Sequence, residues 1–257
     1  MARLRTSFRP GIALTGLALT GLLAGVGAAT LAPASEGATG RTLIRHPHPS
    51  PSHFTRGVIN NEWFPLKAGT RYVYRGVSGH ATVRDVMEAT YRTKVIEGVT
   101  CRVVLDRGYA HGRLTERTFD WYAQTKAGVV WYFGENTTTF DKSGHPTGHE
   151  GSFQSGVNGA QAGIFMTPHP HMGPVYAQEN LPGVAEDRFT VFRHGGQVSV
   201  PLLTSRSALV TKEFSPIEPG VIEHKFYVRN VGDVYDVTVH GGHEDARLVA
   251  VTHFPHP

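Results

Sequence analysis

The alternation of polar and apolar residues is clearest from Leu114 to Glu135. In the first arm of this stretch, Phe119 and Trp121 fall on the same side of an extended chain, between polar residues. A period of two is typical of a β-strand with one packed face. The second arm, Val129 to Phe133, is continuously β-branched or aromatic, as expected for a strand covered on both faces. Gly128 lies between the arms and suits a tight connection, so the stretch predicts a β-hairpin.

Short runs of the same kind recur along most of the chain, and glycine, proline and acidic residues separate them. Predicted strands cover residues 71–75, 80–86, 90–96, 99–106, 189–192, 197–200, 207–214, 221–228, 233–240 and 247–253. No segment after the N-terminal region has the repeat of an amphipathic helix. We therefore expect a mainly β fold, with a single curved antiparallel sheet or a half-barrel or barrel-like meander.

Glycine becomes frequent from residue 134 to residue 175. This composition predicts a long glycine-rich loop, with a short helix at residues 159–165 as its candidate regular element. Long loops in compact domains often carry function, so we expect this loop to border a binding site.

The N-terminal region has the features of a secretory signal peptide. Arg3, Arg5 and Arg9 precede an uncharged stretch, and Ala32-Pro33-Ala34 offers a small-residue cleavage site. The uncharged stretch is long enough that an uncleaved membrane anchor is the alternative, but its many small residues favour cleavage. We expect a secreted, extracellular protein without a stable membrane span after signal cleavage.

Three regions follow from this interpretation. Residues 1–34 form the signal peptide, residues 35–55 a flexible mature N-terminus, and residues 56–257 a single β-rich domain. The proline-punctuated, polar composition of the second region supports its flexibility.

Charge argues against a nucleic-acid partner. The whole chain has 25 basic and 21 acidic residues, which gives a formal net charge of +4. The signal region contains three of the basic residues and no acidic ones, so the mature chain falls to 22 − 21 = +1. The basicity of the whole sequence thus belongs mostly to the signal region.

Cys101 is the only cysteine, so the chain has no internal disulfide. Its neighbours in TCRVVLD predict a strand, and we expect a buried, unreactive thiol. A nucleophilic cysteine would need a histidine held beside it.

Several sequence blocks resemble a family of secreted bacterial proteins that is common in actinobacteria and has no known activity. The blocks are N-x-W-F-P-L, D-W-Y-A-Q, V-W-Y-F-G-E and E-P-G-V-x-E, within a region from about Asn60 to Gly242. The resemblance implies a recurring domain and carries no activity to transfer. A looser similarity, based on the spacing of strands alone, is to the half-barrel of lipoprotein carriers, in which a sheet curves around an apolar ligand.

Two adjacent aromatic pairs form the first candidate site, Trp121 with Tyr122 and Trp131 with Tyr132. Neighbouring residues of a strand point to opposite faces, so each pair places one ring on each face of the sheet. If the second face is not covered by protein, these rings could bind a small molecule, glycan or lipid. Core packing is the alternative interpretation.

Carboxylates form the second candidate site, because they lie in or beside the blocks that define the resemblance. They are Asp120, Glu135, Glu179, Glu186, Asp187 and Glu223. A close pair would suit glycoside hydrolysis, and several oxygens together would suit Ca²⁺. The corresponding function is a secreted enzyme with or without a metal, whereas salt-bridged or solvated carboxylates are the alternative.

Histidines form the third candidate site. His169 and His171 precede Met172, and two imidazoles with a thioether would suit Cu, while imidazole also binds Zn. The two rings could share one ion only if the chain bends, and exposed loop histidines are the alternative.

The sequence contains no nucleophile elbow, phosphate loop, His-Glu-x-x-His motif or dinucleotide-binding fingerprint. Our preferred hypothesis is therefore a secreted binding protein for a small molecule, glycan or lipid on an aromatic-lined β surface. A carboxylate-based enzyme and a histidine-rich metal-binding protein are the alternatives, with Zn, Cu or Ca as candidate cofactors.

Overall fold

The structure is a computed structural model that describes residues 43–256. The expected signal peptide and the first part of the expected flexible segment lie outside these residues. The elements are β1 (Leu43–Ile44), a 3₁₀ helix (Pro51–His53), β2 (Thr70–Ser78), β3 (Ala81–Ile96), β4 (Val99–Ala110), β5 (Arg113–Gln124), β6 (Val130–Phe140), β7 (Pro146–Gly148), β8 (Phe153–Gln154), β9 (Gln161–Met166), β10 (Val175–Ala177), β11 (Glu179–Asn180), β12 (Arg188–Val200), β13 (Leu203–Phe214), β14 (Ile222–Val228), β15 (Gly232–His240) and β16 (Glu244–His253). No α-helix occurs within this part of the chain.

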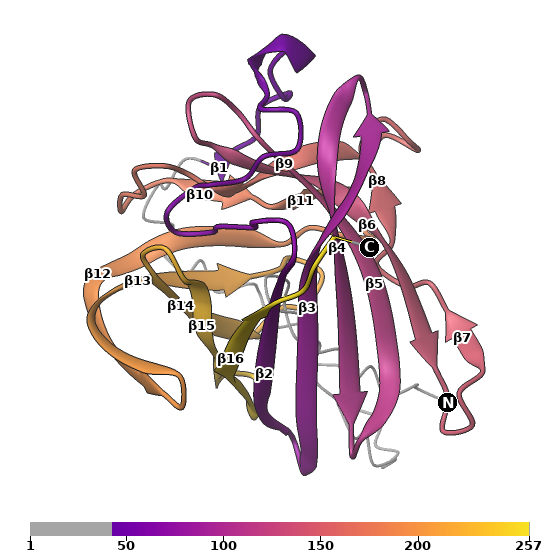
Figure 1. Cartoon of the computed structure of the whole chain (residues 1–257), viewed down its shortest axis with the longest axis vertical. Coiled ribbons are helices and arrows are strands. Elements are labelled where there is room, and N and C mark those ends of the chain that lie inside the picture. Colours follow the sequence, from indigo (N-terminus) through magenta and orange to yellow (C-terminus); the bar gives the residue numbers. More distant parts are fainter. Residues whose placement is uncertain (1–42, 257) are drawn as a thin grey trace, which may run out of the picture.

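The strands form one large sheet, whose long strands fall into two runs (Figure 1). Strands β2 to β6 pair in chain order, and so do β12 to β16. Antiparallel pairing of β16 with β2 joins the two runs, so the last strand lies beside the first long one. Only the short pair of β1 and β10 is parallel among the described strands. The expected mainly β fold with a curved sheet is confirmed, and the sheet is not closed into a barrel.

One short segment, Val175–Asn180, contacts both ends of this sheet. Its first part, β10, pairs with β12, and its last part, β11, pairs with β9. Only Gln178 separates the two strands. Gly163 of β9 permits this arrangement, because a Cβ atom there would overlap the backbone oxygen of Gln178.

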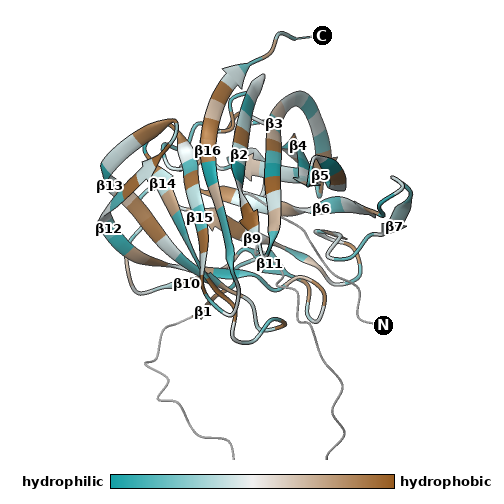
Figure 2. Cartoon of the chain, turned by 90° about the horizontal axis from the view of Figure 1, so that it is seen from below, coloured by the Kyte–Doolittle hydropathy of each residue, from teal (hydrophilic) through white to brown (hydrophobic). Residues whose placement is uncertain are grey.

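The sheet has two differently packed faces. We call the face that carries Tyr74, Tyr122, Tyr132 and Tyr227 the inner face, and these four side chains belong to the larger core cluster. A second cluster, which includes Trp121, lies on the opposite side of β5 and β6. Hydrophobic and hydrophilic residues accordingly alternate along the strands (Figure 2).

In two places, two predicted strands belong to one long strand. Residues 80–86 and 90–96 belong to a single strand, β3, because the chain between them is buried on both sides from Val86 to Ala89. Residues 189–192 and 197–200 were expected to form a hairpin, but both lie in β12. The intervening glycines accommodate bulges instead of a turn, since a Cβ atom at Gly196 would overlap Val210.

The glycine-rich region also contains more regular structure than expected. Strand β6 continues to Phe140, and β7 and β8 pair with it. The helix expected at residues 159–165 is wrong, because Gln161–Met166 is strand β9. Apolar residues in this strand pack on both sides of the sheet, which favours extended chain over a helix.

Candidate functional site

The inner face carries a row of buried carboxyl groups between its tyrosines. In the strand register, Asp85 lies opposite Tyr74, Asp106 opposite Thr118, and Asp120 opposite Glu135. Ten carboxyl side chains of the sheet are at most 6% exposed. They are Asp85, Asp106, Glu116, Asp120, Glu135, Glu179, Glu213, Glu223, Asp233 and Asp236. Lys225 is the only buried lysine or arginine among residues 43–256, so the interior is strongly acidic.

At one end of this row, a single tyrosine hydroxyl contacts two carboxyl groups. The Oη atom of Tyr132 lies 2.7 Å from Oδ1 of Asp120 and 2.8 Å from Oε2 of Glu135. A phenol carries one proton and can donate only one of these hydrogen bonds. The other contact is favourable when the carboxyl group itself carries a proton and donates it to the phenol oxygen.

Threonine hydroxyls extend this hydrogen-bonded group along the same two strands, β5 and β6. Thr137 donates to Oε1 of Glu135 at 2.8 Å, and its Oγ1 atom lies 3.0 Å from Oγ1 of Thr118. Thr118 in turn lies 3.4 Å from Oε1 of Glu116. The hairpin of β5 and β6 supplies all of these side chains. Those of β5 occupy alternate positions, whereas on β6 an irregularity in the pairing turns both Tyr132 and Glu135 inwards.

Burial is the largest cause of the raised pKa values in the site, and the charges of neighbouring acids come second. Burial raises the pKa of Tyr122 and of Tyr132 well above the usual value, and the charges of Asp120 and Glu135 raise both further. The two phenol rings stack with centroids 4.7 Å apart. Burial likewise raises the pKa of Asp85, and the nearby charge of Asp106 adds to the effect. The neutral phenols of Tyr122 and Tyr132 and the neutral carboxyl group of Asp85 are therefore favoured.

A second acidic group lies on β13 to β15. Nζ of Lys225 is 2.8 Å from Oε2 of Glu213. Burial alone would lower the pKa of Lys225, but the surrounding carboxylates of Glu213, Asp236 and Glu223 raise it overall. Burial also raises the pKa of Asp233, and it raises that of Asp236 together with the charge of its neighbour Asp233.

The four aromatic residues predicted as a ligand surface are all buried. Tyr122 and Tyr132 belong to the inner cluster, whereas Trp121 and Trp131 belong to the second cluster on the other side. The pairs thus place one ring on each face, but protein covers both faces at this position. Their part in ligand binding stays a prediction.

Three of the six predicted carboxylates come together. Asp120 and Glu135 share Tyr132, and the charge of Glu179 raises the pKa of the same tyrosine. Glu179 is buried.

The other three lie elsewhere. Glu186 lies within 3.9 Å of Arg45 and 3.8 Å of Arg188, outside the row. The backbone oxygen of the buried Asp187 accepts hydrogen bonds from the backbone N–H groups of Gln178 and Glu179. Glu223 belongs to the group around Lys225.

His169 and His171 are both exposed. Nδ1 of His171 lies 3.3 Å from the backbone oxygen of His169. Within residues 43–256, no three or more His, Cys, Asp or Glu residues are grouped as a metal ion would require. The metal-binding hypothesis gains no support from this part of the chain.

Sequence reasoning missed Asp85, Asp106, Glu116, Glu213, Asp233 and Asp236. The apolar pattern of β14 indicates the wrong face, because Glu223, Lys225 and Tyr227 are buried while Ile222, Phe226 and Val228 are partly exposed. A signal was present in the alternation itself, since charged residues at every second position of a strand share one face.

Comparison with known proteins gives little further guidance. No family model matches this chain, and no curated protein matches it. A solved structure from Bacteroides fragilis, a protein considered to be exported and to have a YmcC-like fold, superposes with a TM-score of 0.42 and 12% identity. The match covers 75% of this chain and 99% of that one. No helix within residues 43–256 is long and apolar enough to cross a membrane.

Proposed function

We propose that the protein is an exported binding protein for a polar small molecule or glycan, which the inner face holds through tyrosine and carboxyl groups. The observation that carries this proposal is the Tyr132 hydroxyl held between Asp120 and Glu135. The threonines around this pair add further donors and acceptors. Such a set offers many hydrogen bonds to hydroxyl or amino groups of a ligand.

The cost of burying these groups supports a functional role. A core that served stability alone would be filled with apolar side chains, because buried ionisable groups lose their hydration. The inner face instead keeps acids in the middle of an aromatic cluster. Its acidity also disfavours an anionic lipid, so we infer a neutral or positively charged ligand.

Ligand binding requires local opening of the fold, because the binding groups are buried. Binding that requires a conformational change is slower than ordinary protein association, whose rate constant is roughly 10⁵–10⁷ M⁻¹s⁻¹. We therefore expect an association rate constant below this range. Stopped-flow measurement of the observed rate against ligand concentration checks this expectation.

The test begins with small-molecule extraction of mature protein purified from its native host, followed by mass spectrometry. The compound that is found is titrated by calorimetry against the wild type and the Tyr132→Phe variant. Loss of one hydroxyl that bonds the ligand should weaken binding about tenfold or more. Tyr72→Phe is the matched control, because its hydroxyl donates to the backbone oxygen of Pro65 at 2.7 Å, away from the acids. Equal weakening by both variants would count against this site.

A second function is favoured by the closeness of Asp120 and Glu135. Two carboxyl groups within hydrogen-bonding distance of one phenol are near enough to divide acid and nucleophile roles in glycoside hydrolysis with retention. Hydrolysis of a panel of aryl glycosides by the wild type, abolished in both Asp120→Asn and Glu135→Gln, would establish an enzyme. Binding without turnover would leave the binding function alone.

Export is part of the proposal and rests on the features of residues 1–34. N-terminal sequencing of protein recovered from the culture medium should begin close to residue 35. Recovery of the uncut chain with the membrane fraction would support the anchor alternative.

A further inference from the structure

The outer face of β2 to β5 carries arginines directly behind the buried acids. Arg84 precedes Asp85, Arg107 follows Asp106, and each pair sits on adjacent positions of one strand. Adjacent residues of a strand point to opposite faces, so the acids are inside and the bases outside. The outer surface is therefore basic, although the net charge of the mature chain is only +1.

These arginines are neighbours in the strand register. Arg75 lies opposite Arg247 on one side and opposite Arg84 on the other, which aligns three arginines across β16, β2 and β3. Arg107 lies opposite Arg117 on the next pair of strands. We call these five residues the arginine surface.

Three of the five guanidinium groups are exposed and free of acids. Arg75, Arg84 and Arg117 are exposed, and none of them forms an ion pair with any residue in the described range. Arg107 shares the carboxylate of Glu88, 2.8 Å away, with a further arginine. The surface consequently retains an excess of positive charge.

Aromatic rings hold several of these groups in place. The guanidinium carbon of Arg84 lies 5.3 Å from the ring centre of Tyr109, and that of Arg117 lies 5.6 Å from the ring centre of Phe140. Contacts of this kind orient the planar group while leaving its N–H donors available.

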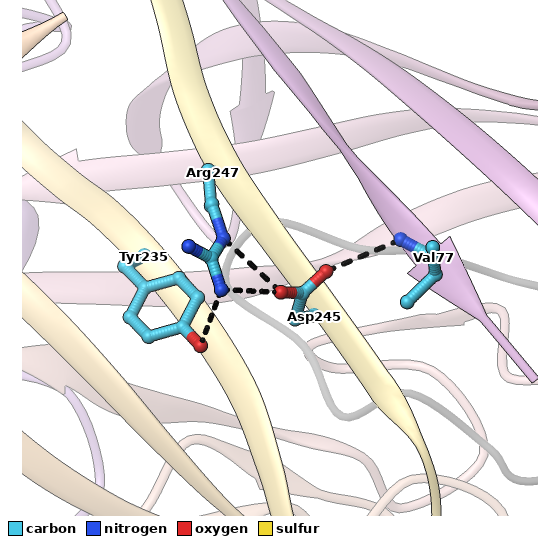
Figure 3. Close-up of polar contacts among 4 residues, drawn as sticks. All are labelled: Val77, Tyr235, Asp245 and Arg247. Carbon is cyan, nitrogen blue, oxygen red and sulfur yellow. Dashed lines mark hydrogen bonds and ion pairs between the residues drawn. The ribbon is translucent and has the colours of Figure 1, made fainter. Parts of the chain in front are cut away.

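Arg247 is held by its own neighbours (Figure 3). Its Nη2 atom donates to Oδ2 of Asp245 at 2.7 Å and to Oη of Tyr235 at 3.1 Å. Oδ1 of the same aspartate accepts from the backbone N–H of Val77 at 3.3 Å. Arg247 thus marks a fixed end of the row, with part of its charge balanced.

We propose that the arginine surface binds linear polyphosphate. Like charges directly opposite one another in a sheet destabilise it, so an anion bound between the three aligned arginines would stabilise the fold. Arginine presents a fork of donors that matches phosphate oxygens, and a row that crosses the strands at about 4.8 Å per strand suits an extended polyanion.

An anionic membrane surface fits less well. Interfacial proteins insert exposed aromatic or aliphatic side chains beside their basic residues. Here Tyr109, Phe119 and Phe140 are only partly exposed and lie beneath arginines. Val77 and Val95 are the strongly exposed apolar side chains of β2 and β3, which gives little to insert.

The experiment titrates the mature chain with inorganic polyphosphate from about 50 to about 200 mM salt. Binding should weaken steeply with salt for the wild type. The triple variant Arg75→Gln, Arg84→Gln, Arg117→Gln should bind about tenfold or more weakly, and the slope of log K against log salt should fall by about two to three. The matched control is Lys142→Gln, Arg193→Gln, Arg206→Gln, which removes the same charge from exposed positions outside the arginine surface.

Three results would overturn the proposal. They are absence of polyphosphate binding, equal weakening by the control variant, and tighter binding to phosphatidylglycerol vesicles or to poly-L-glutamate than to polyphosphate. Thermal unfolding verifies that each variant is folded, and the single variant Arg84→Gln replaces the triple one if folding fails. The outcome is independent of the inner-face ligand, because the two sites lie on opposite faces.

Discussion

Nζ of Lys225 lies 2.8 Å from Oε2 of Glu213, and solvent reaches almost none of either side chain. Removing the cation would leave the surrounding acids without their only buried positive partner within residues 43–256. We predict that Lys225→Met lowers the free energy of unfolding by about 3–5 kcal/mol, as measured by urea denaturation. Lys212→Met is the control. Lys212 is partly exposed on the other face of the neighbouring strand, and its loss should cost less than about 1 kcal/mol.

The pair of Asp233 and Asp236 predicts that stability falls as pH rises. Burial raises the pKa of Asp233 to about 6 and that of Asp236 well above its usual range. The folded state therefore holds protons that the unfolded state, with carboxyl pKa values near 3.9, releases first. The stabilisation is complete below about pH 4 and is lost as pH rises through about 6.

Urea denaturation should show this loss as a fall of about 1 kcal/mol or more between pH 5 and pH 8. Asp236→Asn should flatten the profile, because one of the two coupled groups no longer ionises. Glu150→Gln, at an exposed position, should leave the profile unchanged. A wild-type stability that rises across this interval would contradict the assignment.

Gly163 predicts a local effect of a single methyl group. In Gly163→Ala the new Cβ atom would overlap the backbone of Gln178, so the segment Val175–Asn180 must move away from β9. We expect a loss of about 1–3 kcal/mol and faster hydrogen exchange in that segment. Gly159→Ala meets no atom within 4 Å and changes only a backbone with positive φ, so exchange in Val175–Asn180 should not change.

Cys101 should react with thiol reagents only after unfolding. Burial raises the pKa of its thiol to about 12, although the charge of Lys94 lowers it slightly. Labelling with a chromogenic disulfide reagent should follow the urea unfolding curve. Rapid labelling of the folded protein at neutral pH would show that the thiol is accessible, contrary to this structure.

Much of the fold follows from local pattern, and one kind of exception is a place where a glycine has two interpretations. The hairpin of β5 and β6 was predicted correctly, with Gly128 in its connection. Gly195 and Gly196 also suggest a turn, yet they lie inside β12 as a bulge. Only packing against β13 distinguishes the two outcomes, and the sequence of one strand does not contain that information.

The candidate site was partly predictable for a related reason. Asp120 and Glu135 face one another because a hairpin fixes its own register, so local sequence was sufficient. Asp85 and Asp233 are 148 residues apart, and their inward orientation depends on strands paired across the whole chain. In β14 the charged residues point inwards, which reverses the usual rule for an amphipathic strand.

The pairing of β16 with β2 has a consequence for how the molecule is made. These strands come from the two ends of the domain, yet they lie side by side in the middle of the sheet. During synthesis, β2 can pair with β3 early, but it can pair with β16 only after nearly the whole domain has emerged. Contacts between segments so distant in sequence form slowly. An unpaired strand edge stays available to other chains during that interval. The domain should fold late and all at once, after β16 has emerged and can pair with β2.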